Sequence, residues 1–207
     1  MSKTFQAPRR LELEMEAQTS SAGMNPKLQN MVYSMLNSIG EDPQREGLQR
    51  TPQRFAKAWK EMTSGYQMDP VGVVGEGLFA SEGSGLVSVR NIDFFSLCEH
   101  HLLPFWGQVS IAYWPGDKIL GLSKLARLVE VFSKRLQVQE RLTQEIAESI
   151  SSLAQAKAVH VTVRAQHMCM MMRGVQKTGS LTHTETSLGL DKITDAQKER
   201  LYLACGE

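Results

Sequence analysis

A thiol and two imidazoles lie within four consecutive residues of this 207-residue chain, at Cys98, His100 and His101. Cys98 and His101 are three residues apart, so both side chains can reach one zinc ion, and Cys169 can supply a third ligand from a distant segment. Three protein ligands leave one coordination position for water, which is typical of a catalytic zinc site. His100 and His167 would then stand beside the metal as groups that transfer protons.

A structural explanation of the same residues stays open at this point. Cysteine is a common core residue and histidines often only satisfy hydrogen bonds, so a lone Cys-x-x-His is weak evidence. A metal site is favoured because His167, Cys169 and Arg173 share one face of a predicted strand. A closed structural zinc would instead take a fourth ligand from His100, His167 or Cys205.

A second group of polar residues is suited to phosphate. A helix that begins at Ser123 would offer free backbone N–H groups and the positive end of its dipole, with Lys124 and Arg127 on its surface and Arg173 from another segment. Charges on an amphipathic helix are usually only its solvated face, so these residues alone do not establish a phosphate site.

Gln139 and Glu140 are candidates for binding a purine. A carboxylate is the natural acceptor for the adjacent ring N–H and amino groups of a purine edge. A glutamate in the first turn of a helix more often only complements the helix dipole, so this pair also needs further support.

Charge and cysteine content limit the kinds of partner. Lysine and arginine number 23 against 22 aspartates and glutamates, which gives a formal net charge of +1, so we expect neither nucleic acid nor an anionic membrane as a partner. Three cysteines are too few for a disulfide framework, and no apolar run resembles a signal peptide or a membrane span. We therefore expect a cytoplasmic protein.

Hydrophobic periodicity predicts helices that begin at Pro26, Thr51, Ser123, Val138 and Thr194. Strands are predicted at 86–95, 108–114, 159–173 and 181–188, the first with a bulge near residues 90–91. The glycine-rich stretch 69–85 is predicted to be loop. Strand pairs joined by hairpins, with helices between the pairs, indicate an α+β domain with an antiparallel sheet.

The chain is predicted to hold one domain and a tail. Residues 1–24 have too little apolar material to bury, so we expect a flexible tail. Residues 25–207 form the domain, with a helical N-terminal part at 25–66 and a catalytic core at 86–189.

Between residues 45 and 189 the chain resembles the GTP cyclohydrolase I family. The resemblance lies in four blocks, which are Cys98-Glu99-His100-His101, residues 121–127, residues 137–142, and His167-Met168-Cys169 followed by Arg173-Gly174. Four such blocks in order are very specific. Departures from the family pattern lie outside the candidate site, at Leu181, His183, Glu185 and residues 190–192.

The resemblance implies a fold, an assembly and a site. The fold is the tunnelling fold, or T-fold, an antiparallel four-stranded sheet with a pair of helices, and its units join into a toroidal homo-oligomer, here a decamer of two pentamers with active sites between subunits. Zinc would be held by Cys98, His101 and Cys169, with His100 and His167 as acid-base groups. The groups implied to hold GTP are Gln139 and Glu140 at the guanine, Ser123, Lys124, Arg127 and Arg173 at the ribose and triphosphate, and Arg54 from a neighbouring subunit.

The family reaction is hydrolysis of GTP at C8 of the guanine ring, which releases formate and gives 7,8-dihydroneopterin triphosphate. This is the first step of pterin biosynthesis, toward tetrahydrofolate or tetrahydrobiopterin, and the triphosphate serves as an anchor rather than being cleaved. Two alternatives stay open: a T-fold relative of 7-deazaguanine synthesis that uses a cysteine thioimide and a nicotinamide cofactor, and a non-catalytic purine-binding zinc protein.

Overall fold

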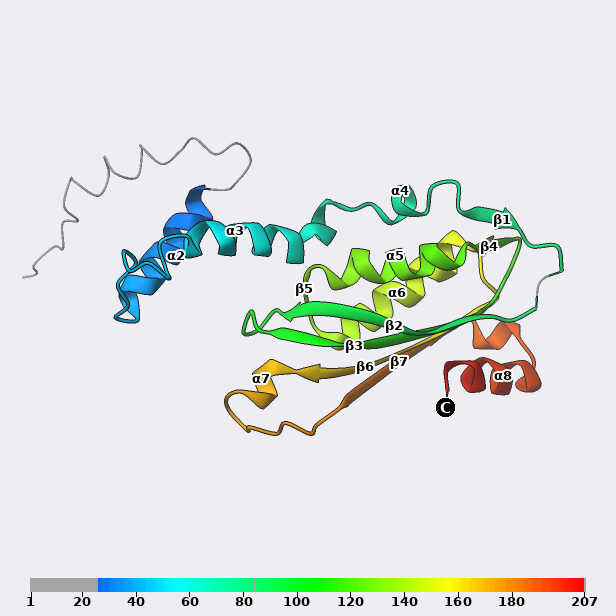
Figure 1. Cartoon of the computed structure of the whole chain (residues 1–207). Helices are drawn as coiled ribbons and strands as arrows, with labels where there is room; N and C mark the ends of the chain where they lie inside the picture. The colour runs from blue at the N-terminus through cyan, green and yellow to red at the C-terminus, as the bar shows by residue number, and fades with distance from the viewer. Residues whose placement is uncertain (1–25, 84, 207) are drawn as a thin grey trace, which may run out of the picture. The chain divides into compact units, whose positions relative to one another are not determined.

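The computed structural model describes residues 26–83 and 85–206 (Figure 1). The predicted tail at 1–24 lies outside the described residues. The chain divides into two compact units, the first ending at Glu61 and the second beginning at Met62. The domain boundaries expected from the sequence stay a prediction. In the part of the chain that the structure describes, no helix is both long enough and apolar enough to cross a membrane.

The first unit contains α2 (Pro26–Ser38) and nearly all of α3 (Thr51–Met62). Both helices begin where the sequence predicts. Each has a proline in its first turn, where the missing N–H would have no partner within the helix. Each helix also buries two side chains, at Val32 and Leu36 in α2 and at Pro52 and Ala56 in α3.

The second unit is built on a sheet whose strands have the order β5-β2-β3-β6-β7. Its long strands β2 (Val87–Cys98), β3 (Pro104–Trp114), β6 (Ala158–His167) and β7 (Thr182–Leu188) pair antiparallel in that order. The short β5 (Leu136–Gln137) adds a parallel pairing beside the end of β2. The predicted α+β class with an antiparallel sheet is therefore confirmed.

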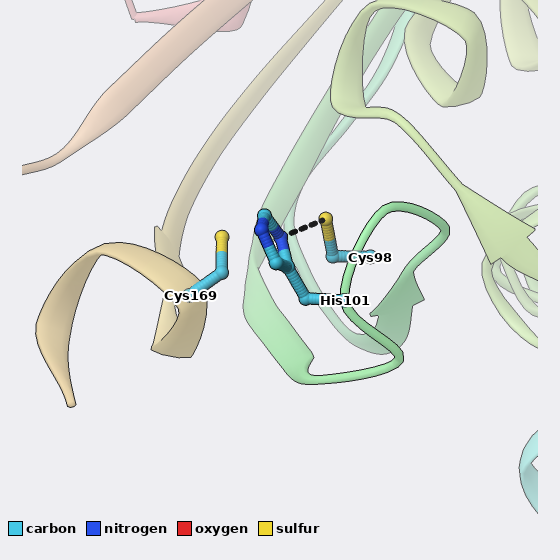
Figure 2. Close-up of side chains that lie close together, drawn as sticks. All are labelled: Cys98, His101 and Cys169. Atoms are coloured by element: carbon cyan, nitrogen blue, oxygen red, sulfur yellow. Dashed lines mark hydrogen bonds between the residues drawn. The ribbon is translucent and has the colours of Figure 1, made fainter. Parts of the chain in front are cut away.

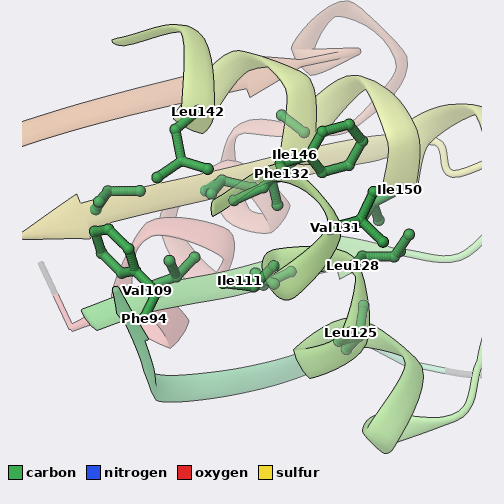
Figure 3. Close-up of a cluster of buried hydrophobic side chains, with 14 of the residues drawn as sticks. Phe94, Val109, Ile111, Leu125, Leu128, Val131, Phe132, Leu142, Ile146 and Ile150 are labelled. Carbon is green, nitrogen blue, oxygen red and sulfur yellow. The ribbon is translucent and has the colours of Figure 1, made fainter. Parts of the chain in front are cut away.

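Helices cover both faces of this sheet (Figure 1). The helices α5 (Leu122–Ser133) and α6 (Gln139–Leu153) pack on one face, and α8 (Asp195–Cys205) packs on the other, against β3 and β6. Strand alternation separates the two cores, because successive side chains point to opposite faces. Val109 and Ile111 of β3 are in the main core with Leu125 and Leu128 of α5, as Figure 3 shows. Ala112 instead belongs to the small core around α8.

Two local features follow the sequence prediction closely. The pairing of β2 with β3 shifts register between Val89 and Ile92, and Asn91 has a positive φ of 57°, which confirms the bulge. Thr194 caps α8 in a capping box with Gln197, because each side chain bonds the backbone of the other residue.

The prediction of loop throughout 69–85 is wrong. After the short 3-10 helix η1 (Ser64–Gln67), Asp69 accepts hydrogen bonds from the N–H groups of Val71 and Gly72 and so caps α4 (Pro70–Val74). The strand β1 (Leu78–Ala80) then pairs with β4 (Lys118–Leu120). This pairing joins residues about 40 positions apart, so no local pattern could reveal it.

Two other boundaries also differ from the prediction. The strand predicted over 159–173 ends at His167, and the next residues form the one-turn helix α7 (Met168–Met171). His167 pairs with Phe105, and the next partner on β3 would be Pro104, which has no N–H to donate. The helix α5 begins at Leu122 with Gly121 as its cap, so Ser123 lies inside the first turn. A 3-10 turn, η2 (Leu190–Lys192), precedes α8.

Candidate metal centre

The ends of two strands bring Cys98, His101 and Cys169 together. Cys98 is the last residue of β2, His101 lies in the turn that follows, and Cys169 lies in α7 directly after β6. Because β3 pairs antiparallel with both strands, β2 and β6 end at the same end of the sheet, beside the start of β3. Figure 2 shows the three side chains converging there.

A tight turn places His101 beside Cys98. The carbonyl of Cys98 accepts hydrogen bonds from the N–H groups of His101 (3.3 Å) and Leu102 (2.8 Å), and the Cys98 N–H donates to Leu103 at 2.8 Å. Leu102 has a left-handed φ of 55°, a conformation that costs a non-glycine residue on the order of 1 kcal/mol. The turn leaves Cys98 Sγ and His101 Nδ1 4.0 Å apart.

The three side chains fit a metal ion. Their ligand atoms all lie within 4.8 Å of one another, whereas ligand atoms around tetrahedral zinc are about 3.5–3.8 Å apart, so a small adjustment would suffice. Two thiolates and one imidazole are ligands that zinc prefers, and they leave a fourth position free. Cys98 is buried, Cys169 is half-buried and His101 is exposed, so the free position can face solvent.

The surroundings of Cys169 are consistent with a cation. Burial raises the pKa of the Cys169 thiol, and the nearby Cys98 raises this pKa further, while Arg173 lowers it. A thiol whose thiolate form is disfavoured in this way becomes a stable thiolate when a divalent cation lies beside it.

His167 is held firmly beside this cluster. Its ring stacks on Phe105 with centroids 4.6 Å apart and an angle of 2° between the planes, and its Nε2 lies 2.8 Å from Gln139 Oε1. Burial lowers the pKa of His167, and the charge of Glu140 partly opposes this shift. A lowered pKa favours the neutral imidazole near pH 7, the form that accepts a proton.

His100 has the opposite environment. Its side chain is 64% exposed, and its Nε2 lies 3.9 Å from Glu99 Oε1. The rings of His100 and His101 meet edge to face with centroids 6.3 Å apart. His100 is therefore at the solvent side of the cluster.

An ion-pair network that the sequence analysis did not predict contacts Glu99 in the turn after β2. Arg141 bonds the carboxylate of Glu99, and its Nε donates to Gln137 Oε1 at 2.9 Å. The Glu99 N–H also donates to the Gln137 carbonyl at 3.0 Å. The sequence signal was that Glu99 adjoins a candidate ligand; the i, i+4 rule for helices did not apply, because Gln137 belongs to β5 and Arg141 to α6.

Three further candidates lie at the same end of the sheet. Glu140 is exposed, and its effect on the pKa of His167 indicates that the two side chains are close. Arg173 is also exposed and donates from Nη1 to the carbonyl of Cys169 at 3.4 Å. Gln139 is buried, and three protein acceptors surround its amide nitrogen, so donation to guanine would require the exchange of one of these hydrogen bonds.

Three candidates on α5 lie away from the cluster. Ser123, Lys124 and Arg127 lie in the first half of α5. The other end of α5 is nearer the cluster, because Ser96 of β2 donates from Oγ to the carbonyl of Arg135, just after α5, at 3.4 Å. About 15 Å of helix separates Ser123 from the last residue of α5. Lys124 Nζ instead donates to Val73 O at 3.2 Å. The last candidate, Arg54, is exposed on α3 in the first unit.

The fold and the cluster together define an α+β domain in which two cysteines and a histidine that could hold a metal ion meet at one end of its sheet. The model of the protein family GTP cyclohydrolase I matches residues 28–205, which is most of the chain. The chain belongs to the GTP cyclohydrolase I family.

Two relatives named GTP cyclohydrolase 1 agree with this assignment. The chain is 54% identical over 167 residues to GTP cyclohydrolase 1 of Deinococcus radiodurans, covering 80% of this chain and 77% of that protein. It is 50% identical over 179 residues to GTP cyclohydrolase 1 of Campylobacter jejuni subsp. doylei, covering 86% and 94%. Among solved structures, the apo form of an archaeosine synthase described as QueF-like matches with a TM-score of 0.44 and 19% identity, over 51% of this chain and 95% of that one.

Proposed function

We propose that this protein is a zinc-dependent GTP cyclohydrolase I, which hydrolyses GTP at C8 of guanine, releases formate and forms 7,8-dihydroneopterin triphosphate for pterin biosynthesis. The observation that carries the proposal is the convergence of Cys98, His101 and Cys169 beside His167 in a chain of this family. The open side of this cluster suits a reaction that consumes water.

The zinc would be held by Cys98, His101 and Cys169. Bound there, it supplies Lewis acidity that makes water nucleophilic near neutral pH. His167 accepts a proton as the imidazole ring of guanine opens, because burial keeps it largely neutral near pH 7 by lowering its pKa. His100 is exposed and can exchange protons between the site and solvent.

Glu140 holds the guanine in this proposal. Its exposed carboxylate can accept two hydrogen bonds, from the ring N1–H and the 2-amino group of guanine. Because Glu140 is close enough to influence the pKa of His167, a base bound at Glu140 has its imidazole ring near the acid-base groups. Gln139 adjoins Glu140 in the expected guanine site, but its side chain would have to give up a hydrogen bond to donate to the base.

The triphosphate would need residues from two copies of the chain. Arg173 lies beside Cys169, whereas Ser123, Lys124 and Arg127 lie toward the far end of the same domain. A site that combines both groups can form where the cluster of one copy meets α5 of another. This supports a homo-oligomer with sites between subunits, for which the family resemblance implies a toroidal T-fold decamer, and Arg54 would also come from a neighbouring subunit.

The deciding experiment combines turnover with metal analysis. Purified protein with bound zinc should convert GTP into formate and a product that becomes a fluorescent pterin on oxidation. His100→Ala and His167→Ala should each lower kcat by at least ~100-fold, the usual scale for a lost acid-base group. Near-normal rates in both variants would contradict the mechanism. NADPH oxidation with a nitrile substrate, and none with GTP, would support a role in 7-deazaguanine synthesis instead.

A further inference from the structure

The side chain of Gln139 is buried although it is the first residue of α6. Only 2% of the residue is exposed. Its Nε2 lies 2.9 Å from the carbonyl of Val163 and 3.1 Å from that of Thr182, and also 3.1 Å from Thr184 Oγ1. Its Oε1 lies 2.8 Å from His167 Nε2. This one amide therefore connects α6 with β6 and β7 at the place where His167 is held.

The neighbours of this amide determine which way it points. The two carbonyl oxygens can only accept hydrogen bonds. Thr143 Oγ1 donates its hydrogen to the backbone carbonyl of Gln139 at 2.7 Å. In the 2.7 Å contact between the two threonine hydroxyls, Thr143 must therefore be the acceptor and Thr184 the donor. The Thr184 hydroxyl has then used its hydrogen and is an acceptor for Gln139. All three neighbours of Nε2 are acceptors, so the amide nitrogen faces them and Oε1 faces His167.

This orientation determines the tautomer of His167. A carbonyl oxygen has no hydrogen to donate, so the 2.8 Å bond requires a proton on His167 Nε2. In a neutral imidazole the other nitrogen, Nδ1, is then the acceptor. Stacking on Phe105, with 2° between the ring planes, also restrains the rotation of the ring.

We propose that Gln139 is a positioning residue that holds His167 as the Nε2–H tautomer, so that Nδ1 is the atom that accepts a proton from the substrate or water. The inference rests on the proposed function, because it gives His167 its acid-base role. It leaves guanine recognition by side chains to Glu140, since the Gln139 amide is used on His167 and its three acceptors.

The tautomer can be measured directly on the wild-type protein. The zinc-loaded full chain would be labelled with ¹⁵N in its five histidines and its ring nitrogens observed by two-bond ¹H–¹⁵N NMR. His167→Asn would assign the signals. At about pH 8, where histidine is neutral, we expect a protonated Nε2 and an unprotonated Nδ1 for His167. A protonated Nδ1, or a mixture of both tautomers, would overturn the proposal. This measurement needs no turnover, so it separates failure of the inference from failure of the proposed function.

A substitution then tests the consequence for the reaction. Gln139→Met has a similar length but no acceptor for His167, so we expect a mixture of tautomers and a kcat about 10- to 100-fold lower, with KM for GTP within about twofold of wild type. Gln144→Met is the matched control, because Gln144 is on the same helix and bonds the exposed Glu148. It should leave tautomer and kcat unchanged.

The opposite pattern would favour a role in binding the base. A raised KM for GTP in Gln139→Met, with kcat and the His167 tautomer unchanged, would assign Gln139 to guanine and overturn its positioning role. Loss of its hydrogen bonds leaves buried acceptors unpaired, so the variant can fail to fold. In that event the wild-type tautomer alone decides.

Discussion

Residues in and around the candidate metal centre differ widely in their exposure to solvent. Cys98 and His167 are at least partly buried, whereas His100 and Glu140 face solvent. Burial lowers the pKa of His167 and favours its neutral form. Exposure leaves Glu140 accessible to a ligand. The chemistry of each residue thus depends on its environment as well as on its type.

Zinc removal is the first test at this scale. Cys169→Ser should lose most of its bound zinc, because serine is a poor ligand, and its activity should fall to background. Treatment of the wild type with a strong chelator should have the same effect, reversed by added zinc. Elemental analysis alongside the formate assay checks both statements. Active protein without bound zinc would contradict the assignment.

The exposed carboxylate of Glu140 leads to a second prediction. Glu140→Gln places an amide donor against the donors of guanine, so kcat/KM for GTP should fall about 10- to 100-fold, as expected for about 1.5–3 kcal/mol of lost charge-assisted bonding. Glu148→Gln is the control, since Glu148 is also on α6 but bonds Gln144. Steady-state kinetics with GTP measure the effect. Unchanged constants would remove Glu140 from the guanine site.

At the scale of elements, β3 matters most because it pairs with both strands that lead to the metal cluster. It starts at Pro104, which ends the pairing with β6 after the Phe105–His167 pair. This limit on β6 allows the next residues to turn into α7 and carry Cys169 toward Cys98.

Close packing at Gly107 can be tested by adding one methyl group. A Cβ at this position would lie 1.8 Å from the carbonyl oxygen of Arg164 and 2.7 Å from Ala165 Cα, so β3 and β6 could not keep their spacing. We expect Gly107→Ala to lower the free energy of unfolding by about 3 kcal/mol. Gly179→Ala is the control, because an added Cβ there meets no heavy atom within 4 Å. Similar urea midpoints for both variants would show that the strands can adapt.

A tyrosine in the same strand should make stability depend on alkaline pH. Tyr113 is fully buried, and its hydroxyl oxygen accepts the Leu120 N–H at 2.9 Å. Burial raises the pKa of Tyr113, so folding favours the neutral phenol. This contribution is complete below the unfolded pKa of about 10 and is lost as pH rises above it.

Tyr113→Phe separates this contribution from other alkaline effects. Near pH 7 the variant should be less stable by about 1 kcal/mol, because it loses one hydrogen bond. As pH rises above about 10, the wild type should lose stability faster, and the two should converge. Denaturant unfolding at a series of pH values measures both curves. If the stability of both proteins fell in parallel as pH rises, the raised pKa of Tyr113 would be contradicted.

At the scale of the whole molecule, the candidate residues form two groups within one chain. The metal cluster, His167 and Glu140 lie at one end of the second unit, and Ser123 and Lys124 lie toward the other. The proposed site between two copies of the chain would let both groups bind one substrate. The cytoplasmic location, and the expectation of neither nucleic-acid nor membrane partners, stay predictions.

Mixing two inactive variants tests the shared site. His167→Ala damages the cluster group and Lys124→Ala the other group, so each variant alone should be nearly inactive. Co-assembled in equal amounts, about a quarter of the sites should combine two intact groups and recover activity. Light scattering should give ten times the 23.1-kDa chain mass. No recovery in mixed assemblies would place the complete site within one chain.

Much of this protein could be predicted from its sequence. The spacing of Cys98 and His101 places both side chains in one turn, and the alternation in β3 and β6 indicates the buried face of each strand. The bulge near Asn91 and the cap at Thr194 also have local signals. These features depend on residues within a few positions of one another, where spacing alone determines which side chains meet.

Only the tertiary structure decided how distant residues combine. The register that pairs Phe105 with His167 ends β6, creates α7 and brings Cys169 to Cys98. Packing of α6 on β6 and β7 directs the Gln139 amide onto His167, a contact that its place at a helix start does not suggest. Sequence determines residue types and local spacing, but strand register and helix packing determine which remote groups touch, because those depend on the fit of whole surfaces.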